Sequence, residues 1–499
     1  MQNTPHTSGR TVADFEKKLD FPAGGAGVGR KLGPVFGVLL LALAGIGAAS
    51  AQSTWNSGVG GSWATATDWS PAGVPAAGAD IVFNGAATIA NPAQTANRSI
   101  TLDGTRTAGS ILFNNDLGAF TNSVTTGTGG PLVFDAASGP ATITANGGGT
   151  GTGNSTVSVA MTLTDSLVAI VNNTTATSAA GALNLTAAIS GPGGFTKQGD
   201  GLATFGTGTK TYTGATILDG GRMRMSQLAH PTATSSVTIN AGAQLNLISA
   251  STYGFGGATL NLNGSGATSG PYAAFPGAIR NDTNLAVVLT SRVVLQSDTL
   301  LQVPGSASGS LSLSNVVSGP GGLTLTAPGS DANQGQLVLD GANSYAGSTV
   351  IRAGLLTLGS SATASLGAGD VTVMSGSSMV SGASARLAIP STALNAITDV
   401  AVLSLAGGNV AGVADDGYIS LAAGVNEWVG GLILGGTAQG PGTYGSTASA
   451  ATFQNDEYFS GSGILTVIPE PAAPLLVLLG ALVCTQDRRR GRGRARQSG

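Results

Sequence analysis

The sequence predicts an all-β protein with a solenoid architecture, in which short strands stack coil upon coil. Two observations carry this prediction. The 499-residue chain is rich in glycine, with 79 residues, and poor in charged and aromatic residues, at 9% and 5%. Short stretches such as Leu260–Asn263 and Leu311–Ser314 alternate apolar and polar residues, which is typical of half-buried strands. Between Gln52 and Val467 the sequence contains no amphipathic helical pattern.

Turn residues complete this pattern. Glycine, Asn and Asp separate the alternating stretches at short intervals, and glycine supplies the positive φ angles that tight corners require. A single coil cannot bury its own apolar face, whereas stacking covers that face with the next coil. We therefore expect many short strands and many turns around one continuous core.

The distribution of charge and cysteine excludes several classes of protein. Basic residues are concentrated at the two ends of the chain, and the stretch between Gln52 and Glu470 is acidic. Such a stretch lacks the basic patch of a nucleic-acid-binding protein, so we expect no nucleic-acid partner. The one cysteine, Cys484, lies near the C-terminus. The body is therefore expected to have neither disulfides nor a thiolate metal site.

Residues 1–51 have the organisation of a signal peptide with an extended basic first region. A basic pair precedes an apolar run at 32–48, and the small residues Ala49 and Ala51 follow in a small-x-small pattern. A basic region, an apolar helix and a small-residue site in this order predict cleavage by signal peptidase before Gln52. The alternative is that the apolar run is a buried helix of the mature protein.

The C-terminal segment 467–499 combines three features in order. Pro469, Glu470 and Pro471 precede an apolar run at 472–484. A basic cluster follows, formed by Arg488, Arg489, Arg490, Arg492, Arg494 and Arg496. This arrangement resembles the PEP-CTERM sorting signal of Gram-negative bacteria that produce exopolysaccharide. The resemblance implies that an exosortase recognises the Pro-Glu-Pro motif and removes the tail.

The physical properties of this tail agree with transient insertion into the inner membrane. Its apolar run is shorter than the ~20 residues that a helix needs to span a bilayer. The arginines would hold the end of the tail on the cytoplasmic side, because basic residues are retained there. The alternative is a plain C-terminal membrane anchor.

Two segments of the body, 189–225 and 317–358, are similar to each other. Both contain Ser-Gly-Pro-Gly-Gly, then an alternating strand, then a Tyr-x-Gly-x-Thr element that begins at Tyr212 or Tyr345. This unit resembles the autotransporter-associated β-strand repeat, which implies coils of a right-handed parallel β-helix. In the first copy, Lys197 and the glycines after it resemble the Lys-x-Gly-x-Gly pattern of the family. The second copy does not contain this pattern.

The ends of a solenoid need caps, because an open sheet edge invites aggregation. We expect residues 52–130 to form a tryptophan-rich N-terminal cap and first strands, 131–425 the solenoid body, and 426–466 a closing segment before the tail. Tryptophans gather in the first of these segments at Trp55, Trp63 and Trp69. We interpret them as the core of the cap. The alternative is a platform for glycan contact, since aromatic rings lie well against sugar rings.

The sequence contains little that indicates catalysis, and we expect no catalytic residues, no cofactor and no metal. It has only two histidines, which makes Ser-His-Asp catalysis and histidine zinc sites implausible. His230 is expected to be a solvated turn residue. The enzymatic alternative is a β-helix polysaccharide lyase or glycoside hydrolase, in which paired carboxylates act as acid and base. Its candidate residues are Asp415 with Asp416, Asp200 with Lys197, and Asp219 with Arg222.

These observations lead to one main functional hypothesis. The chain is expected to be an exported, non-catalytic protein of the cell surface or extracellular matrix, a scaffold or adhesin associated with exopolysaccharide. Its partners would be extracellular polysaccharide or other surface proteins, with signal peptidase and exosortase acting during export. A third hypothesis, an autotransporter passenger, conflicts with the sorting-like tail.

Overall fold

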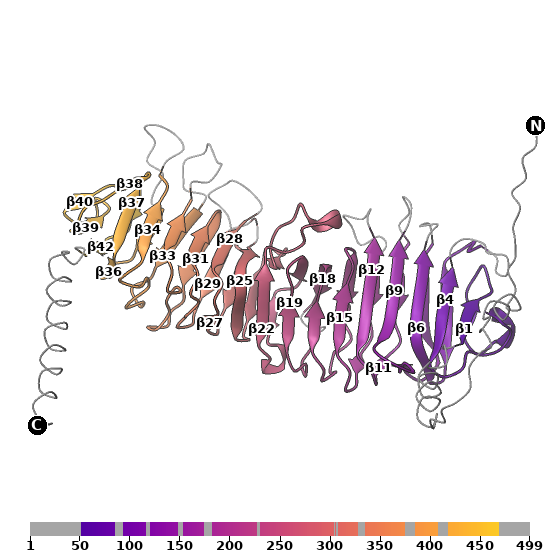
Figure 1. Ribbon diagram of the computed structural model, residues 1–499. Coiled ribbons are helices and arrows are strands. Elements are labelled where there is room, and N and C mark those ends of the chain that lie inside the picture. Colours follow the sequence, from indigo (N-terminus) through magenta and orange to yellow (C-terminus); the bar gives the residue numbers. More distant parts are fainter. Residues whose placement is uncertain are drawn as a thin grey trace, which may run out of the picture. The chain divides into compact units, whose positions relative to one another are not determined.

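The computed structural model describes residues 51–84, 93–115, 120–147, 153–173, 182–226, 230–303, 305, 308–327, 335–374, 385–407 and 418–468. The chain divides into two units, Met1–Ala49 and Ser50–Gly499, and all described residues belong to the second unit. Strands and turns make up the described part of this unit, and Figure 1 shows the strands following one another in chain order along the stack. The described residues also form the 3-10 turns η2 (Ala66–Asp68), η4 (Phe255–Gly257) and η5 (Gly270–Tyr272).

In the N-terminal coils, successive strands stack into three parallel ladders. The first ladder contains β1 (Gln52–Trp55), β4 (Ala79–Asn84), β6 (Arg106–Asn115), β9 (Ala141–Gly147), β12 (Leu167–Asn173) and β15 (Phe195–Gln198). The second contains β2 (Gly61–Ser62), β5 (Arg98–Asp103), β7 (Asn122–Gly129), β10 (Ser155–Val157), β13 (Leu183–Leu185) and β16 (Leu202–Phe205). The third starts on β6 and continues through β8 (Leu132–Phe134), β11 (Met161–Leu163) and β14 (Ile189–Ser190).

Further along the chain the first two ladders continue. The first passes through β17 (Thr216–Leu218), β19 (Val237–Ile239), β22 (Leu260–Gly264), β25 (Val293–Gln302) and β27 (Val317–Ser318). The second passes through β18 (Gly221–Met225), β20 (Ala243–Leu247), β23 (Ile279–Asn281) and the C-terminal half of β25. It then includes β28 (Leu323–Thr326), β30 (Thr349–Ile351), β32 (Val371–Val373), β34 (Val402–Leu405) and β37 (Gly431–Leu434).

A separate parallel sheet of eight strands forms another side of the later coils. It consists of β21 (Ser251–Tyr253), β24 (Ala286–Leu289), β26 (Ser310–Leu313), β29 (Gln336–Leu339), β31 (Gly354–Leu358), β33 (Ala385–Ile389), β35 (Ile419–Leu421) and β41 (Phe459–Ser460). The all-β prediction is confirmed, and the long parallel ladders have the topology of a parallel β-helix. The right-handed coiling expected from the family resemblance stays a prediction.

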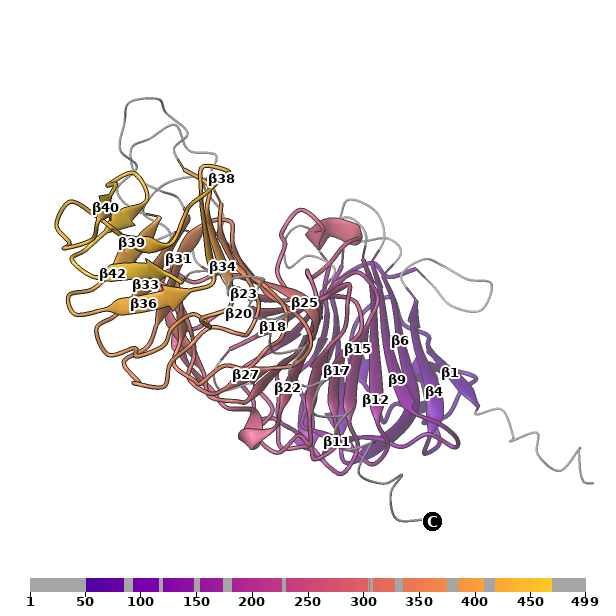
Figure 2. The ribbon, with the colours of Figure 1, turned by 60° about the vertical axis from the view of Figure 1, so that its left-hand side comes forward.

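Antiparallel pairs occur in the first and last described segments. At the start, β3 (Trp69–Ser70) runs antiparallel to β1. Near the end, β38 (Thr437–Ala438) runs antiparallel to β37. There β36 (Asn426–Val429), β42 (Ile464–Val467), β39 (Gly442–Gly445) and β40 (Phe453–Gln454) form a small sheet of their own (Figure 2). These segments are the ones expected to cap the solenoid.

The core runs through the interior of the coils as columns of apolar side chains. Along the first ladder, Ile81 pairs with Ile111 and Ile111 pairs with Ile143, and all three are buried. Parallel pairing places each inward side chain about 4.8 Å from its equivalent in the next coil. Every fully buried aliphatic side chain then contributes about 2 kcal/mol of hydrophobic stabilisation. Period-two alternation therefore produces one continuous core, because stacking repeats the inward positions in register.

The Ser-Gly-Pro-Gly-Gly segments of the two repeat copies form equivalent corners. Gly191 and Gly319 both have a φ of +112°, which L-residues with a side chain rarely adopt. A β-carbon at Gly191 would overlap the carbonyl of Leu163, and one at Gly319 would overlap the carbonyl of Leu295. These corners require glycine for both reasons: the backbone conformation and the closeness of the neighbouring coil.

The Tyr-x-Gly-x-Thr elements of the two copies are equivalent as well. The buried hydroxyl of Tyr212 is hydrogen-bonded to that of Thr216 at 2.7 Å, and Tyr345 is paired with Thr349 at 2.6 Å. Each pair supplies a partner to two buried hydroxyl groups, and a buried hydroxyl left without any partner would cost about 1–3 kcal/mol; Thr216 has a second partner in Thr234, at 3.0 Å. The Tyr-x-Gly-x-Thr spacing that the two copies share thus corresponds to one local hydrogen bond inside the coil.

The expected hydrophobic helices at 32–48 and 472–484 lie outside the described residues. Among the residues that the structure describes, no helix is long and apolar enough to cross a membrane. Signal-peptide cleavage and tail sorting therefore stay predictions.

Candidate functional site

Lys197 was a candidate for catalysis, but its ammonium group is committed to the backbone of two successive coils. Its side chain points inward from β15 and is fully buried. The Nζ donates to the carbonyl of Gly199 and, at 2.7 Å, to that of Gly220. Burial lowers the pKa of Lys197 from 10.5 to about 7, although the carboxylate of Asp200 partly opposes this change. The residue clamps neighbouring turns together from inside the solenoid.

Lys210 repeats the same arrangement one half-coil later. Its Nζ donates to the carbonyl of Gly208 and, at 2.9 Å, to that of Ala187 in the preceding coil. The ammonium lies 5.2 Å from the centre of the Phe205 ring, within the range of a cation–π contact. Burial lowers its pKa to about 8. Sequence reasoning did not single out this residue, because a lone lysine among glycines and threonines carries no recognisable signal.

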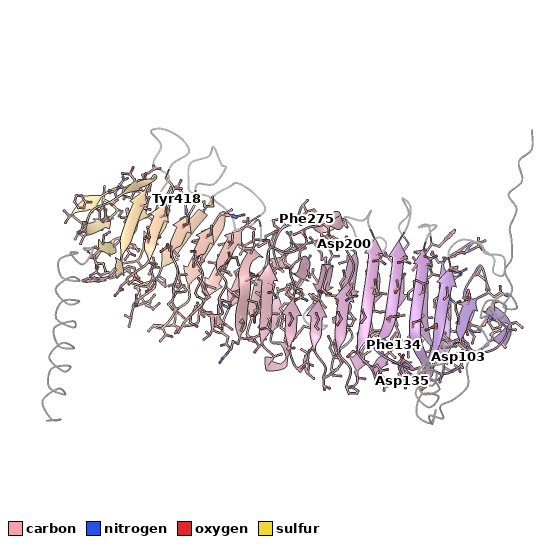
Figure 3. The ribbon with its side chains drawn as sticks, viewed as in Figure 1. Asp103, Phe134, Asp135, Asp200, Phe275 and Tyr418 are labelled. Atoms are coloured by element: carbon pink, nitrogen blue, oxygen red, sulfur yellow. The ribbon has the colours of Figure 1, made fainter. Side chains whose placement is uncertain are left out.

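The acidic catalytic candidates are also engaged in contacts within the solenoid. Asp200 accepts a hydrogen bond from the hydroxyl of Ser269 at 3.1 Å (Asp200 is labelled in Figure 3). Asp219 accepts from the amides of Gln198 and Asn240, its neighbours in the preceding and following coils. Such polar ladders stabilise stacked coils. The remaining candidates, Asp415 and Asp416, lie outside the described residues.

Arg222, which was paired with Asp219 in the enzymatic hypothesis, belongs to a covered cluster on the outer face of β18, β20 and β23. Its Nε donates to the side chain of Gln244 at 2.6 Å, and its guanidinium lies 4.2 Å from the Tyr272 ring centre. Asp282 interacts with it at 3.9 Å and pairs with Arg280 at 2.7 Å. Burial, helped by the charge of Arg280, lowers the pKa of Arg222 to about 10.

This cluster fastens the excursion at 265–277 to the outer face of the sheet. The side-chain amide of Gln244 donates to the carbonyls of Phe275 and Gly277, at 2.6 Å and 2.9 Å. The Phe275 ring, which is labelled in Figure 3, lies over Arg222 and Arg280, with centroid distances of 5.3 Å and 5.5 Å. The arginines are thereby covered, and their role is to hold the excursion in place.

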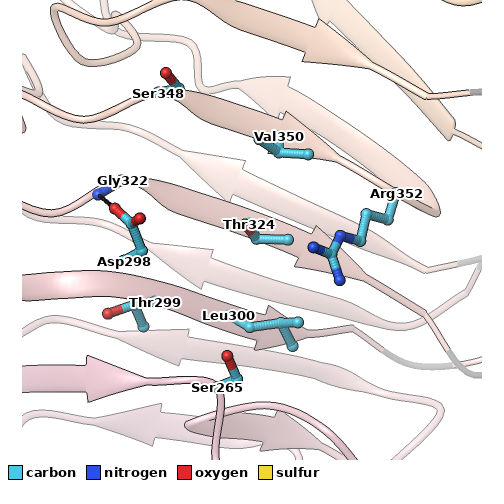
Figure 4. Close-up of a pocket in the computed structure, with 9 residues that line it drawn as sticks. All are labelled: Ser265, Asp298, Thr299, Leu300, Gly322, Thr324, Ser348, Val350 and Arg352. Carbon is cyan, nitrogen blue, oxygen red and sulfur yellow. Dashed lines mark hydrogen bonds between the residues drawn. The ribbon is translucent and has the colours of Figure 1, made fainter.

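Beside this excursion, the outer face of β25, β28 and β30 is open and forms a groove of about 310 Å³ (Figure 4). Its floor is a row of three outward side chains on adjacent strands, Leu300, Thr324 and Val350, which the strand register places side by side. Asp298 and Arg352, both exposed, contribute its charged groups. Hydroxyl groups complete the lining, from Ser265, Thr299 and Ser348.

The chemistry of this groove suits an extended polar ligand. The carboxylate of Asp298 is positioned by a hydrogen bond from the backbone amide of Gly322 at 2.8 Å. Arg352 offers a charged, multiply donating group. The groove thus combines an apolar and hydroxyl-bearing floor with one acidic and one basic side chain. None of the described residues that line the groove is a histidine, and Asp298 is the one carboxylate among them.

The three tryptophans of the opening segment form a buried core. Trp55, Trp63 and Trp69 are at most 1% exposed. The ring of Trp69 lies 5.0 Å from that of Trp55 and 5.1 Å from that of Trp63, and Phe83 packs against all three. Burial agrees with their interpretation as cap core. It corrects the alternative of a glycan platform, because none of these rings exposes a face on which a sugar could stack.

His230 is not the solvated turn residue that the sequence suggested. It is partly buried, and its ring packs 5.5 Å from the ring of Tyr253 and 5.6 Å from that of Phe255. Its Nε2 is 3.5 Å from the backbone amide of Gly254, which donates to it. The residue fastens a turn onto the next coil.

The predicted processing residues are only partly within the described chain. Ala51 and Gln52 are exposed, and Gln52 is the first residue of β1. Ala49 lies outside the described residues, as do Pro469, Glu470 and Pro471 of the sorting motif. The basic cluster of the tail lies outside them too. Across the described part of the chain, no three His, Cys, Asp or Glu side chains gather as a metal site would require.

The repeats match a known family. Residues 195–225 and 332–358, which lie within the two repeat copies, match the Passenger-associated-transport-repeat family, and this match confirms the predicted autotransporter-associated repeat. The chain is also 32% identical over 160 residues to the adhesin BmaC autotransporter of Brucella suis biovar 1 (strain 1330). That alignment covers 32% of this chain and 4% of the adhesin's length. No solved structure matches the chain.

Proposed function

We propose that this chain is an exported, non-catalytic surface protein, a β-solenoid scaffold or adhesin that contacts extracellular polysaccharide. The observation that carries the proposal is the match of two coils of a continuous parallel β-helix to the passenger-associated repeat. The similarity to an autotransporter adhesin supports a role at the cell surface. Exosortase-dependent sorting through the tail, with transient insertion into the inner membrane, is part of the same proposal and rests on the order of motifs in the sequence.

The outer groove of β25, β28 and β30 is the surface that we assign to acidic polysaccharide. Arg352 would pair with carboxylate groups, and the exposed hydroxyl groups of Ser265 and Ser348 would bond to sugar hydroxyls. Long solenoids bind extended ligands by many weak contacts, so one groove need not provide all of the affinity. The binding should weaken with rising ionic strength, because exposed charge pairs are screened by salt.

The proposal is tested by retention of the full-length chain on immobilised alginate, pectate and a neutral glucan, with simultaneous assay of reducing and unsaturated ends. We expect retention without product. Arg352→Ala should lower the affinity for alginate about threefold to tenfold. Arg292→Ala, which removes an exposed arginine outside the groove, is the matched control and should change little.

Two results would contradict this function. Release of sugar products would favour the β-helix lyase or hydrolase, and Asp415→Asn and Asp200→Asn would then be the variants to assay. Absence of retention on every polysaccharide would leave a spacer or a self-assembling coat as the better account.

A further inference from the structure

A second surface lies on the small closing sheet, where the fourth tryptophan is exposed. Trp428 on β36 is 47% exposed, in contrast to the three buried tryptophans of the opening segment. Asn426 and Trp428 point outward from β36, while Glu427 and Val429 point inward and are buried. A large aromatic ring exposed on a strand costs hydrophobic stabilisation of the fold. The ring of Trp428 is therefore accessible to a ligand.

The outward face next to Trp428 carries a row of threonines. Trp428 pairs with Thr466 on β42, and Thr466 pairs with Thr443 on β39. The hydroxyl of Thr443 is 3.0 Å from that of Thr452, which continues the row. The hydroxyl of Thr466 donates to the side-chain oxygen of Asn426 at 2.9 Å. The exposed ring of Trp428 is thus followed, across the sheet, by a row of threonine hydroxyl groups.

A pocket of about 400 Å³ lies next to Trp428, which is one of its lining residues. Besides Trp428 and Asn426, it is lined by Leu394, Asn395 and Asp399. The amide groups offer both donors and acceptors, and the carboxylate offers acceptors. None of the described residues that line it is a lysine or an arginine, so the negative charge of Asp399 disfavours acidic ligands.

Glu427 fixes the wall of this pocket. Its buried carboxyl group accepts hydrogen bonds from the backbone amides of Ile397, at 2.6 Å, and Ala396, at 3.2 Å. The segment that carries Leu394, Asn395 and Asp399 is therefore held against β36 by the residue adjacent to Trp428. A pocket positioned in this way is pre-organised, which lowers the entropic cost of binding.

We propose that this pocket and the adjoining threonine row bind a neutral glycan. The indole of Trp428 stacks on one sugar ring, since aromatic rings pack against the apolar faces of sugars. Asn395, Asn426 and Asp399 bond to its hydroxyl groups, and the threonines follow the next sugars along the chain. The inference rests on the proposed function of an extracellular protein that contacts glycans, but it uses residues separate from those of the groove in Figure 4.

The test uses the full-length chain with dextran, a β-1,3-glucan and a galactomannan as neutral probes and alginate as the acidic probe. Acrylamide quenching of tryptophan fluorescence reports mainly on Trp428, because the other three rings are buried. We expect at least one neutral probe to protect the fluorescence from quenching. Trp428→Ala should weaken its binding about tenfold, and Asn395→Ala should weaken it several-fold. Leu285→Ala removes an exposed apolar side chain elsewhere and should leave binding unchanged.

Each other result overturns the inference, and the results distinguish it from the proposed function. If Trp428→Ala binds the neutral probes as tightly as the parent chain does, and the probes do not change the acrylamide quenching of the parent chain, glycan binding lies elsewhere and the proposed function stands. Retention of alginate alone would do the same. Retention of no probe would overturn both proposals. Concentration-dependent self-association that Trp428→Ala abolishes, measured by sedimentation, would identify the occupant as a second copy of the chain.

Discussion

Replacing Lys197 by methionine tests the conclusion that this buried lysine is a structural clamp. Methionine has a similar length and suits an inward, apolar position, so the substitution removes the charge and the two hydrogen bonds while it preserves packing. Loss of the donor to the carbonyls of Gly199 and Gly220 should cost about 1–3 kcal/mol when the lysine is neutral. The more specific expectation concerns pH.

The pKa of Lys197 is about 7 in the folded chain and near the ordinary value of 10.5 when unfolded. Between these values the unfolded chain binds more protons, so the free energy of unfolding rises with pH. The linkage relation gives a rise of about 2 kcal/mol between pH 7 and pH 9 from this one group. Lys210, with a pKa of about 8, adds a smaller rise that remains in the variant.

The assay is urea denaturation, followed by far-ultraviolet circular dichroism at pH 7, 8 and 9. The difference in unfolding free energy between the parent chain and Lys197→Met should grow by about 2 kcal/mol across this range. Arg292→Met, which removes one exposed charge, should show no such growth. Parallel pH curves for the parent and Lys197→Met would refute the reasoning, because Lys197 would then titrate alike in both states.

Three further substitutions test other contacts. Burial raises the pKa of the Glu427 carboxyl group from 4.5 to about 7, so between these pH values the folded chain binds one proton more than the unfolded chain. The free energy of unfolding should therefore fall as the pH rises from 4.5 to 7. Glu427→Gln should abolish this fall, which chemical denaturation at a series of pH values measures. Gly321→Ala should lower the free energy of unfolding by about 3–5 kcal/mol, because the new β-carbon would overlap the carbonyl of Ser297 in the neighbouring coil. Gly440→Ala is the control, since a β-carbon there meets open space, and it should leave the free energy of unfolding nearly unchanged. Chemical denaturation measures both. Tyr345→Phe should lower the free energy of unfolding by about 1–3 kcal/mol, because it leaves the hydroxyl of Thr349 without this partner. Tyr212→Phe should cost less, because its partner Thr216 also bonds to a threonine in the next coil at 3.0 Å. Hydrogen exchange of the backbone amides in the two coils compares the two variants.

Each of these has a contrary outcome. An unchanged pH profile in Glu427→Gln would mean that this carboxyl group titrates normally in the folded chain. Equal effects of the two glycine substitutions would show that the coils can separate at the corner of Gly321 without cost. Equal protection of the two tyrosine variants would show that the additional threonine in the first copy does not compensate.

The sequence determined the β-solenoid, because the features that specify it are local. Alternation with period two defines an inward and an outward face, and corners such as Gly191 and Gly319 can be read from short motifs. The same holds for the Tyr-x-Gly-x-Thr elements, whose hydrogen bond joins residues four positions apart. The burial of Trp55, Trp63 and Trp69 was likewise indicated by their clustering in an opening segment.

Only the tertiary structure decided which side chains are available for function. The bond between Lys197 and Gly220 joins residues 23 positions apart, and Asp200 meets Ser269 across 69 positions. Such contacts depend on the length of each coil, which varies along the chain and has no periodic signal. The exposure of Trp428 depends likewise on the pairing of β36 with β42, a strand nearly forty residues later. In a stacked structure, alternation specifies the face of a residue, whereas its neighbours in the coils before and after it decide whether it is covered.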